Sequence, residues 1–363
     1  MLTIHKSFIQ PMENNKVRLV TPVTESIDGK STERNIWVEV DSRYEKYLCT
    51  ERCDAMLLGL LHYALENGHD IQAELPVSRK LYFNLQNLLI PLLCGPSGKV
   101  YKKISLLMDH TDEALPNAKA VGTGVSLGID SIYTIARHSK GTDTAYPLTH
   151  LLLFNVGSHA GNEKGLSIYK KHVEKVVKFA GEYNYELVTL DSNYAWEFTQ
   201  VYSNVHPFAA AFAVFSMQKL WGVYLYASAG FAKLDIRLPI EEKVYGGNLM
   251  PILNGVFANE NMQFCADAEG VSRFEKTKYL SDNEIAQKYL YVCTKGADNC
   301  CRCMKCTRTI LSLRLLGKLE EFAAVFPTEK CRIRHEIRLL LKKARQGDAF
   351  SWEIIKEFFN RKK

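Results

Sequence analysis

Apolar and polar positions in residues 116–250 follow two alternating patterns. Uninterrupted apolar runs are separated by longer segments in which apolar residues recur at helical spacing. A strand that is apolar throughout is buried on both faces, which is typical of a parallel sheet covered by helices on both sides. The predicted strands are Ala118–Ser126, His150–Asn155, Glu186–Asp191 and Val223–Ser228, and the predicted helices are Asp130–His138, Ser167–Tyr183 and Phe208–Trp221. The sequence therefore predicts an α/β fold with a parallel, doubly wound sheet.

The flanking segments follow other patterns. Near the N-terminus, Asn35–Val40 alternates like a strand, and Asp54–Glu66 and Arg79–Leu93 have helical spacing, with Ser78 as the N-cap of the second helix. We therefore predict four regions: an N-terminal α+β accessory region (1–115), the α/β domain (116–250), an irregular region that carries a cysteine cluster (251–330) and a basic helical tail (331–363).

Composition and charge indicate an ordinary globular protein and bear on which kinds of ligand it could bind. The chain has 363 residues, of which 47% are hydrophobic and 24% are charged, as in ordinary globular proteins. Its net charge of +6 suits an anionic ligand but is too small to establish nucleic-acid binding. No apolar run has the length of a signal peptide or a membrane span, so we expect a cytoplasmic protein. The tail is typical of a packed helix pair, and contact with RNA stays open because of its basic residues Arg332, Arg334, Arg338, Lys342, Lys343 and Arg345.

The sharpest motif is the segment Gly124–Ser131, which lies between a predicted strand and a predicted helix. Unpaired backbone amides at a helix N-terminus bind phosphate, and Gly128 lets the backbone approach it closely. Ser126 and Ser131 can donate hydrogen bonds, and Asp130 fits as a ligand of the Mg²⁺ that accompanies a triphosphate. The segment is not a Walker loop, because no lysine precedes its last serine. The alternative is an ordinary strand–turn–helix junction capped by serine and aspartate.

This segment resembles the Ser-Gly-Gly-x-Asp-Ser loop of the PP-loop ATP pyrophosphatases, with Leu127 in place of the first motif glycine. Members of that superfamily share the HUP-type α/β fold and split ATP into AMP and pyrophosphate. The resemblance implies that the adenine lies at the end of the second strand of the sheet. The implied ATP-binding residues are Gly124, Ser126, Leu127, Gly128, Ile129, Asp130 and Ser131 in the loop, and Asn155 at the second strand. His159 is a further candidate contact there, and a solvated loop histidine is the favoured alternative for it.

Five of the ten cysteines are crowded into one short stretch. Cys293, Cys300, Cys303 and Cys306 have the spacing Cys-x6-Cys-x2-Cys-x2-Cys, which is typical of four thiolates around a tetrahedral zinc ion. A closed shell of four thiolates leaves no position for water, so the pattern predicts structural Zn²⁺ rather than a catalytic ion. An iron–sulfur cluster is the alternative occupant. Cys301 is a fifth thiol in the same stretch, either spare or able to exchange with Cys300.

The run Asn299–Thr309 resembles the zinc loop of 7-cyano-7-deazaguanine synthases. It is more similar still to the loop Asn-Cys-Gly-Arg-Cys-x-Lys-Cys-x-Arg-Thr of a group of bacterial PP-loop proteins. In the present chain, Cys301 stands where that loop has its glycine. That resemblance extends over most of the chain, including the N-terminal region. It implies an ATP-dependent enzyme with a zinc loop and does not indicate its substrate.

Four further residues are candidates for the site. Arg273 and Lys276 are three apart, so on a helix they share a face from which both can stabilise leaving pyrophosphate. A solvated basic helix face is the alternative. His206 is a candidate substrate contact or acid/base group, or else a buried structural histidine. Ser228 ends a predicted strand, where open parallel sheets bind their ligands.

Three functional hypotheses follow. The first is a ligase or amidotransferase-like enzyme that uses ATP, Mg²⁺ and structural Zn²⁺: it adenylates a small-molecule or peptide substrate for attack by a nitrogen nucleophile, and a homodimer is a candidate assembly. The second is thiolation of a tRNA or a small molecule, with Cys301 or a cluster cysteine as sulfur carrier. The third is a regulatory module that binds ATP without cleaving it. The catalytic residues expected for the first hypothesis are Asp130, Ser131, Arg273 and Lys276.

Overall fold

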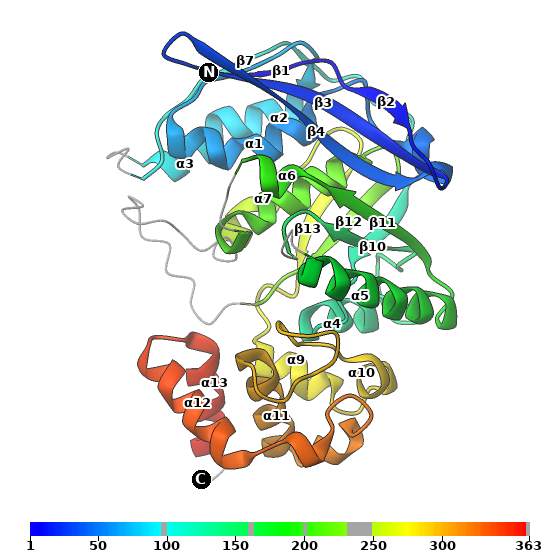
Figure 1. The fold of residues 1–363 in the computed structure, drawn as a ribbon, viewed down its shortest axis with the longest axis vertical. Helices are drawn as coiled ribbons and strands as arrows, with labels where there is room; N and C mark the ends of the chain where they lie inside the picture. Colours follow the sequence, from blue (N-terminus) through cyan, green and yellow to red (C-terminus); the bar gives the residue numbers. More distant parts are fainter. Residues whose placement is uncertain (96–99, 159–162, 199–201, 231–248, 361–363) are drawn as a thin grey trace.

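The computed structural model describes residues 1–95, 100–158, 163–198, 202–230 and 249–360. Five parallel strands form the middle of the molecule (Figure 1) and lie in the spatial order β11-β10-β9-β12-β13. The chain therefore runs outward from β9 first in one direction and then in the other, which places a topological switch point between β9 and β12. The predicted α/β class is confirmed, with a large sheet that is mostly parallel. The strands are β9 (Ala120–Gly124), β10 (His150–Asn155), β11 (Glu186–Ser192), β12 (Trp221–Ala227) and β13 (Gln263–Asp267).

Helices cover both faces of these strands. Leu151 and Leu153 of β10 pack into a core with α4 and α5, whereas Leu152 between them packs into a second core with α1 and α7. Neighbouring side chains of a strand point to opposite faces, so the continuous apolar run of β10 supplies both cores. The covering helices are α4 (Ile129–Arg137) and α5 (Glu163–Glu182) on one face, and α1 (Asp54–Asn67), α6 (Tyr194–Glu197) and α7 (Tyr202–Phe215) on the other.

The N-terminal strands extend the same sheet. β4 pairs antiparallel with β11, so the sheet continues into an antiparallel part and has eleven strands among the described residues. Figure 1 shows these strands at one end of the molecule and the C-terminal helices at the other. The added strands are β1 (Leu2–Ile4), β2 (Phe8–Pro11), β3 (Lys16–Ile27), β4 (Lys30–Asp41), β5 (Ile71–Ala73) and β7 (Leu106–Leu107), while β6 (Val77–Ser78) and β8 (His110–Thr111) form a separate pair.

The second predicted helix of the N-terminal region forms with an irregular middle. Ser78 caps it as predicted, because its hydroxyl accepts a hydrogen bond from the Leu81 amide at 3.2 Å. A π-helical stretch interrupts the helix before Pro91, whose ring would clash with the carbonyl four residues earlier in a regular α-helix. The pieces are α2 (Arg79–Asn84), the π stretch Leu85–Leu89 and α3 (Ile90–Cys94), and a 3-10 helix Ser42–Tyr47 precedes α1.

The boundaries predicted for the helix Phe208–Trp221 are wrong. The helix α7 begins at Tyr202, contains Pro207 and ends at Phe215, while Trp221 already begins β12. Proline removes one backbone hydrogen bond, but Phe208–Phe215 are all buried, and the burial of this apolar stretch offsets the loss.

The C-terminal part is helical around the cysteine cluster. Leu311 of α11, Leu340 of α12 and Ile354 of α13 form a small core, which confirms that the tail is a packed helix pair. Among the described residues, no helix has both the length and the apolar character needed to cross a membrane. The helices are α8 (Met250–Leu253), α9 (Arg273–Leu280), α10 (Glu284–Tyr289), α11 (Met304–Leu316), α12 (Ile333–Arg345) and α13 (Ala349–Asn360), with 3-10 helices at Leu319–Phe322 and Thr328–Lys330.

Candidate functional site

A cavity of about 860 Å³ opens at the carboxyl ends of β9, β10 and β12. Open parallel sheets bind ligands at this edge, next to the switch point, and the volume is in the range of small-molecule sites. One wall is the loop between β9 and α4, and another is aromatic. A third wall comes from the C-terminal helical part. The lining residues include Ser126, Gly128, Asp130 and Ser131 of the loop, Phe154, Tyr202 and Tyr226 of the aromatic wall, and Arg273, Cys293, Lys295, Lys305 and Arg308 of the C-terminal wall.

Hydrogen bonds from three sides fix the predicted phosphate loop. The Ser131 hydroxyl donates to the Gly124 carbonyl at 3.0 Å and accepts from the Ser126 amide at 3.1 Å, so it ties the two ends of the loop together. His172 of α5 donates from Nε2 to the Ser126 carbonyl at 3.1 Å. The Tyr291 amide donates to the carbonyl of the next loop residue, Leu127, at 2.8 Å. The loop carbonyls are thus occupied by the surrounding protein.

The amides at the start of α4 belong to the same wall. The first hydrogen bond of the helix runs from the Ile132 amide to the Gly128 carbonyl. The amides of Ile129, Asp130 and Ser131 therefore precede the intrahelical hydrogen bonds and are the donors that a helix N-terminus offers to an anion. This is the backbone arrangement that the sequence motif predicts.

Leu127, at the position of the first motif glycine, adopts a left-handed backbone conformation. Its φ is 55°, in the left-handed region, which costs a residue with a side chain roughly 1–2 kcal/mol. The Leu127 side chain is fully buried in the core beneath α4, and such burial contributes about 1.5–3 kcal/mol. Burial therefore offsets the strain, and the turn is retained without glycine.

Ser131→Ala is expected to lower the free energy of unfolding by about 1–2 kcal/mol, because the Ser126 amide loses a buried acceptor and the Gly124 carbonyl loses a donor. Urea denaturation measures the change. Ser167→Ala, at an exposed position of α5, is the matched control, with an expected change below about 0.5 kcal/mol. Equal effects of the two substitutions would contradict the bracing role of Ser131.

Asp130 lies between two cations of α9. Its Oδ2 accepts from Arg273 Nη2 at 2.7 Å, and Lys276 Nζ lies 3.6 Å from its Oδ1. Ser272 and Glu275 form a capping box at the start of α9, which fixes the helix end that carries Arg273. Lys276 is fully buried, so a solvated basic face, the alternative for this pair, is wrong for Lys276.

Burial tunes the charges around Lys276. Its ammonium donates to the Ser228 carbonyl at 2.6 Å. The predicted residue Ser228 therefore binds Lys276 through its backbone and does not itself line the cavity. Burial lowers the pKa of Lys276, and the negative charge of Asp130 opposes this shift. Burial raises the pKa of Glu269, which lies close to Lys276. Lys276 is therefore a buried cation that is held by Asp130 and the Ser228 carbonyl.

Two further cations come from the first turns of α11. Lys305 and Arg308 both line the cavity and follow directly from the cysteine cluster. Loss of hydration among the surrounding side chains lowers the pKa of Lys305, and the nearby positive charge of Arg273 lowers it further. Neither residue was among the site residues expected from the sequence. Their spacing of three on one helix was the available signal for a shared face.

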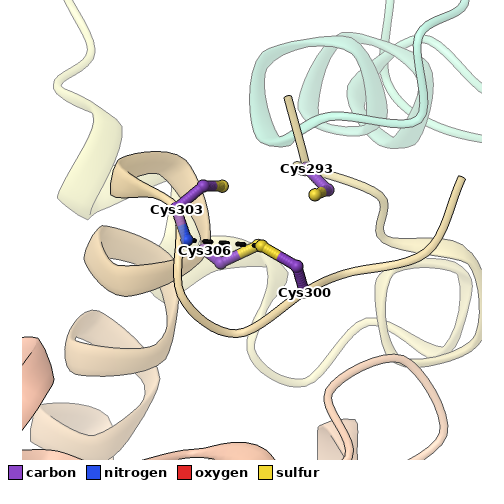
Figure 2. A group of neighbouring side chains, drawn as sticks. All are labelled: Cys293, Cys300, Cys303 and Cys306. Atoms are coloured by element: carbon purple, nitrogen blue, oxygen red, sulfur yellow. Dashed lines mark hydrogen bonds between the residues drawn. The ribbon is translucent and has the colours of Figure 1, made fainter. Parts of the chain in front are cut away.

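The four predicted metal ligands converge. The Sγ atoms of Cys293, Cys300, Cys303 and Cys306 all lie within 4.8 Å of one another (Figure 2). A tetrahedral zinc site with bonds of about 2.3 Å needs sulfur–sulfur separations of roughly 3.8 Å, so small side-chain shifts bring the cluster to that geometry. A hydrogen bond from Cys306 lowers the pKa of Cys303 to about 4, which favours the thiolate that metals bind. The cluster could therefore hold a metal ion, as predicted.

Backbone amides complete the cluster. The Cys303 amide donates to Cys300 Sγ at 3.3 Å, and the Lys295 amide donates to Cys293 Sγ at the same distance. Cys301 faces away, with its Sγ 3.9 Å from the Pro327 carbonyl. Its φ of 54° is left-handed, as expected where the resembling loops have glycine. The structure thus places Cys300, and not Cys301, among the converging thiols.

The remaining predicted residues lie around the second strand and α7. The Asn155 side chain is buried and donates to Asp191 Oδ1 at 3.0 Å, while its neighbour Phe154 lines the cavity, so an adenine contact of Asn155 stays a prediction. His159 lies outside the described residues. His206 Nδ1 is 2.7 Å from the hydroxyl of Tyr226, which itself lines the cavity. His206 therefore supports the wall from behind.

Acidification is expected to destabilise the protein in part through His206. Burial lowers the pKa of His206 from 6.5 to about 4, so the unfolded state binds a proton more readily, and stability falls as the pH drops from about 6.5 towards 4. Because the ring is partly exposed and screened, we expect about 1–2 kcal/mol from this group. Urea denaturation at both pH values should show a smaller loss for His206→Gln than for wild type. An identical loss would contradict this assignment.

No family model matches the chain, and neither curated proteins nor solved structures give a match.

Proposed function

We propose that this protein binds ATP in the cavity and cleaves it between the α- and β-phosphates to activate a substrate. The observation that carries the proposal is the meeting of two anion-binding features in one cavity. The amides at the start of α4 and the cations of α9 and α11 line one cavity at the switch point of a parallel sheet. A nucleoside triphosphate fits such a site because its charge is concentrated at one end.

The loop and the cations have separate tasks in this proposal. The α4 amides bind the phosphates, and Arg273, Lys305 and Arg308 stabilise the charge that develops on the departing pyrophosphate. Asp130 would hold Mg²⁺ with its carboxylate, and Arg273, which contacts that carboxylate at 2.7 Å, lies beside it at the cavity wall. The ion supplies charge neutralisation at the phosphates when bound. Lys276 stays behind Asp130 and holds it in place.

The proposed reaction has two steps. A substrate oxygen attacks the α-phosphorus, the bond to the oxygen that bridges the α- and β-phosphates breaks, and pyrophosphate leaves. A nitrogen nucleophile then displaces AMP from the adenylated substrate, as in the ligase hypothesis. The protein contributes positioning and charge stabilisation, which are large terms for phosphate chemistry. The four cysteines, with a metal ion bound, would hold Lys305 in position, because Lys305 lies between Cys303 and Cys306 in the first turn of α11.

Calorimetric titration tests the binding half of this proposal. Wild type should bind ATP and its analogue with a methylene group between the α- and β-phosphates, and should bind adenosine much more weakly. The double variant Lys305→Ala/Arg308→Ala removes two cavity cations and should weaken ATP binding at least about tenfold, while adenosine binding is unchanged. Lys342→Ala/Arg345→Ala on the exposed face of α12 is the matched charge control. Equal ATP affinity in all three proteins would contradict the proposal.

A further inference from the structure

We propose that the C-terminal helix α13 is part of the anion site, with Phe350 as the positioning residue that holds Arg273 and Arg308 at the cavity wall. The inference deepens the proposed function and rests on it for the identity of the anion. The two arginines come from helices that are distant in the sequence, α9 and α11, and both lie on the wall of the cavity. One aromatic ring of α13 contacts both of them.

The ring of Phe350 backs the two guanidinium groups. The Arg273 guanidinium carbon lies 4.2 Å from the ring centroid, and that of Arg308 lies 5.2 Å away. Both distances are within the range of cation–π attraction. Arg273 thus has Phe350 on one side and the Asp130 carboxylate as its ionic partner. An arginine restrained in this way loses little rotamer freedom when a phosphate binds, so the affinity for the phosphate is greater.

The first turn of α13 is itself anchored to the arginine-bearing helices. Asp348 pairs with Arg308, and the same carboxylate accepts from the Ser351 amide at 2.9 Å, so it caps α13. Glu353 Oε1 accepts from the Phe274 amide at 2.9 Å, which joins α13 to the first turn of α9. These contacts fix Phe350 between the two helices, and they point to a role for the tail beyond packing.

Substitutions at Phe350 separate ring stacking from packing. Phe350→Leu keeps an apolar side chain but removes the ring, and Phe350→Tyr keeps the ring. The probes are inorganic tripolyphosphate, ATP and adenosine, titrated calorimetrically into the full chain. We expect Phe350→Leu to weaken tripolyphosphate and ATP binding by roughly tenfold and to leave adenosine binding unchanged, while Phe350→Tyr retains wild-type affinity. Trp352→Leu, at an exposed aromatic residue of the same helix, should bind all three ligands like wild type.

The outcomes distinguish this inference from the proposed function. Equal tripolyphosphate affinity of wild type and Phe350→Leu would overturn the positioning role, whatever the enzyme does with ATP. Weaker tripolyphosphate binding by Phe350→Leu, with recovery in Phe350→Tyr, would support the role even if AMP is never formed. A loss of affinity that Phe350→Tyr does not recover, or that Trp352→Leu shares, would indicate general damage to α13 and would also overturn the inference. Thermal unfolding of each variant checks that the helix pair stays folded.

Discussion

Asp130→Asn is expected to lower the rate of AMP formation at least about 100-fold while the fold is kept. The amide has the shape of the carboxylate but carries no charge, so it is a poor ligand for Mg²⁺ and a weak partner for Arg273 and Lys276. Because a negative charge is removed beside the phosphates, the affinity for metal-free ATP should be unchanged or higher. Product analysis measures the first effect, and calorimetry without Mg²⁺ measures the second.

The pair of readouts makes this prediction specific. A variant that had only lost its fold would lose both turnover and ATP binding. Loss of the charge alone should lower AMP formation while the affinity for metal-free ATP is unchanged or higher. Asp143→Asn, at an exposed aspartate in the loop after α4, is the matched control and should behave like wild type. Normal AMP formation by Asp130→Asn would show that the carboxylate is not needed for cleavage.

Cys306→Ser is expected to remove the metal and, with it, much of the ATP affinity. Zinc content should fall from about one ion per chain to a small fraction, because serine is a far weaker zinc ligand than a thiolate. Metal binding free energy is coupled to folding, so the first turn of α11 should loosen. That turn carries Lys305 and leads to Arg308, so we expect ATP binding to weaken by more than about tenfold. Elemental analysis and calorimetry measure the two effects.

Cys301→Ser is the matched control for this experiment, since Cys301 lies in the same loop but its thiol faces the Pro327 carbonyl. This variant should keep its metal and its ATP affinity. If Cys301→Ser lost the metal and Cys306→Ser kept it, the assignment of the four ligands would be wrong. Loss of metal in Cys306→Ser with unchanged ATP affinity would contradict the link between the cluster and the cavity.

The apolar pattern was sufficient for the parallel part of the fold. The run His150–Asn155 forms β10 with the predicted boundaries, because its four central residues are apolar, as expected of a strand buried on both faces, and polar residues mark both ends. The pattern could not show that β4 pairs with β11, since the two strands are far apart in the sequence and nothing local specifies the pairing. It also misplaced α7, because the predicted helix begins at Phe208, directly after Pro207, whereas the buried helix contains this proline.

In the candidate site, too, local features could be predicted from the sequence and contacts between distant segments could not. Local motifs predicted the loop at the start of α4 and the four cysteines, because spacing along the chain defines both features. The contact of His172 with the Ser126 carbonyl and the stacking of Phe350 on Arg273 join segments from different helices. No spacing rule links such residues, so only the packed structure brings them to the cavity. The meeting of residues from α9, α11 and α13 at the cavity wall is therefore a result of tertiary structure alone.

Phosphorus NMR of wild-type protein with Mg²⁺ and ATP, supplied with a cell-extract metabolite pool as the source of substrate, tests the central claim most directly. The proposed cleavage predicts signals of AMP and pyrophosphate that grow together and are absent with Asp130→Asn. Formation of ADP and inorganic phosphate would contradict the proposed cleavage between the α- and β-phosphates.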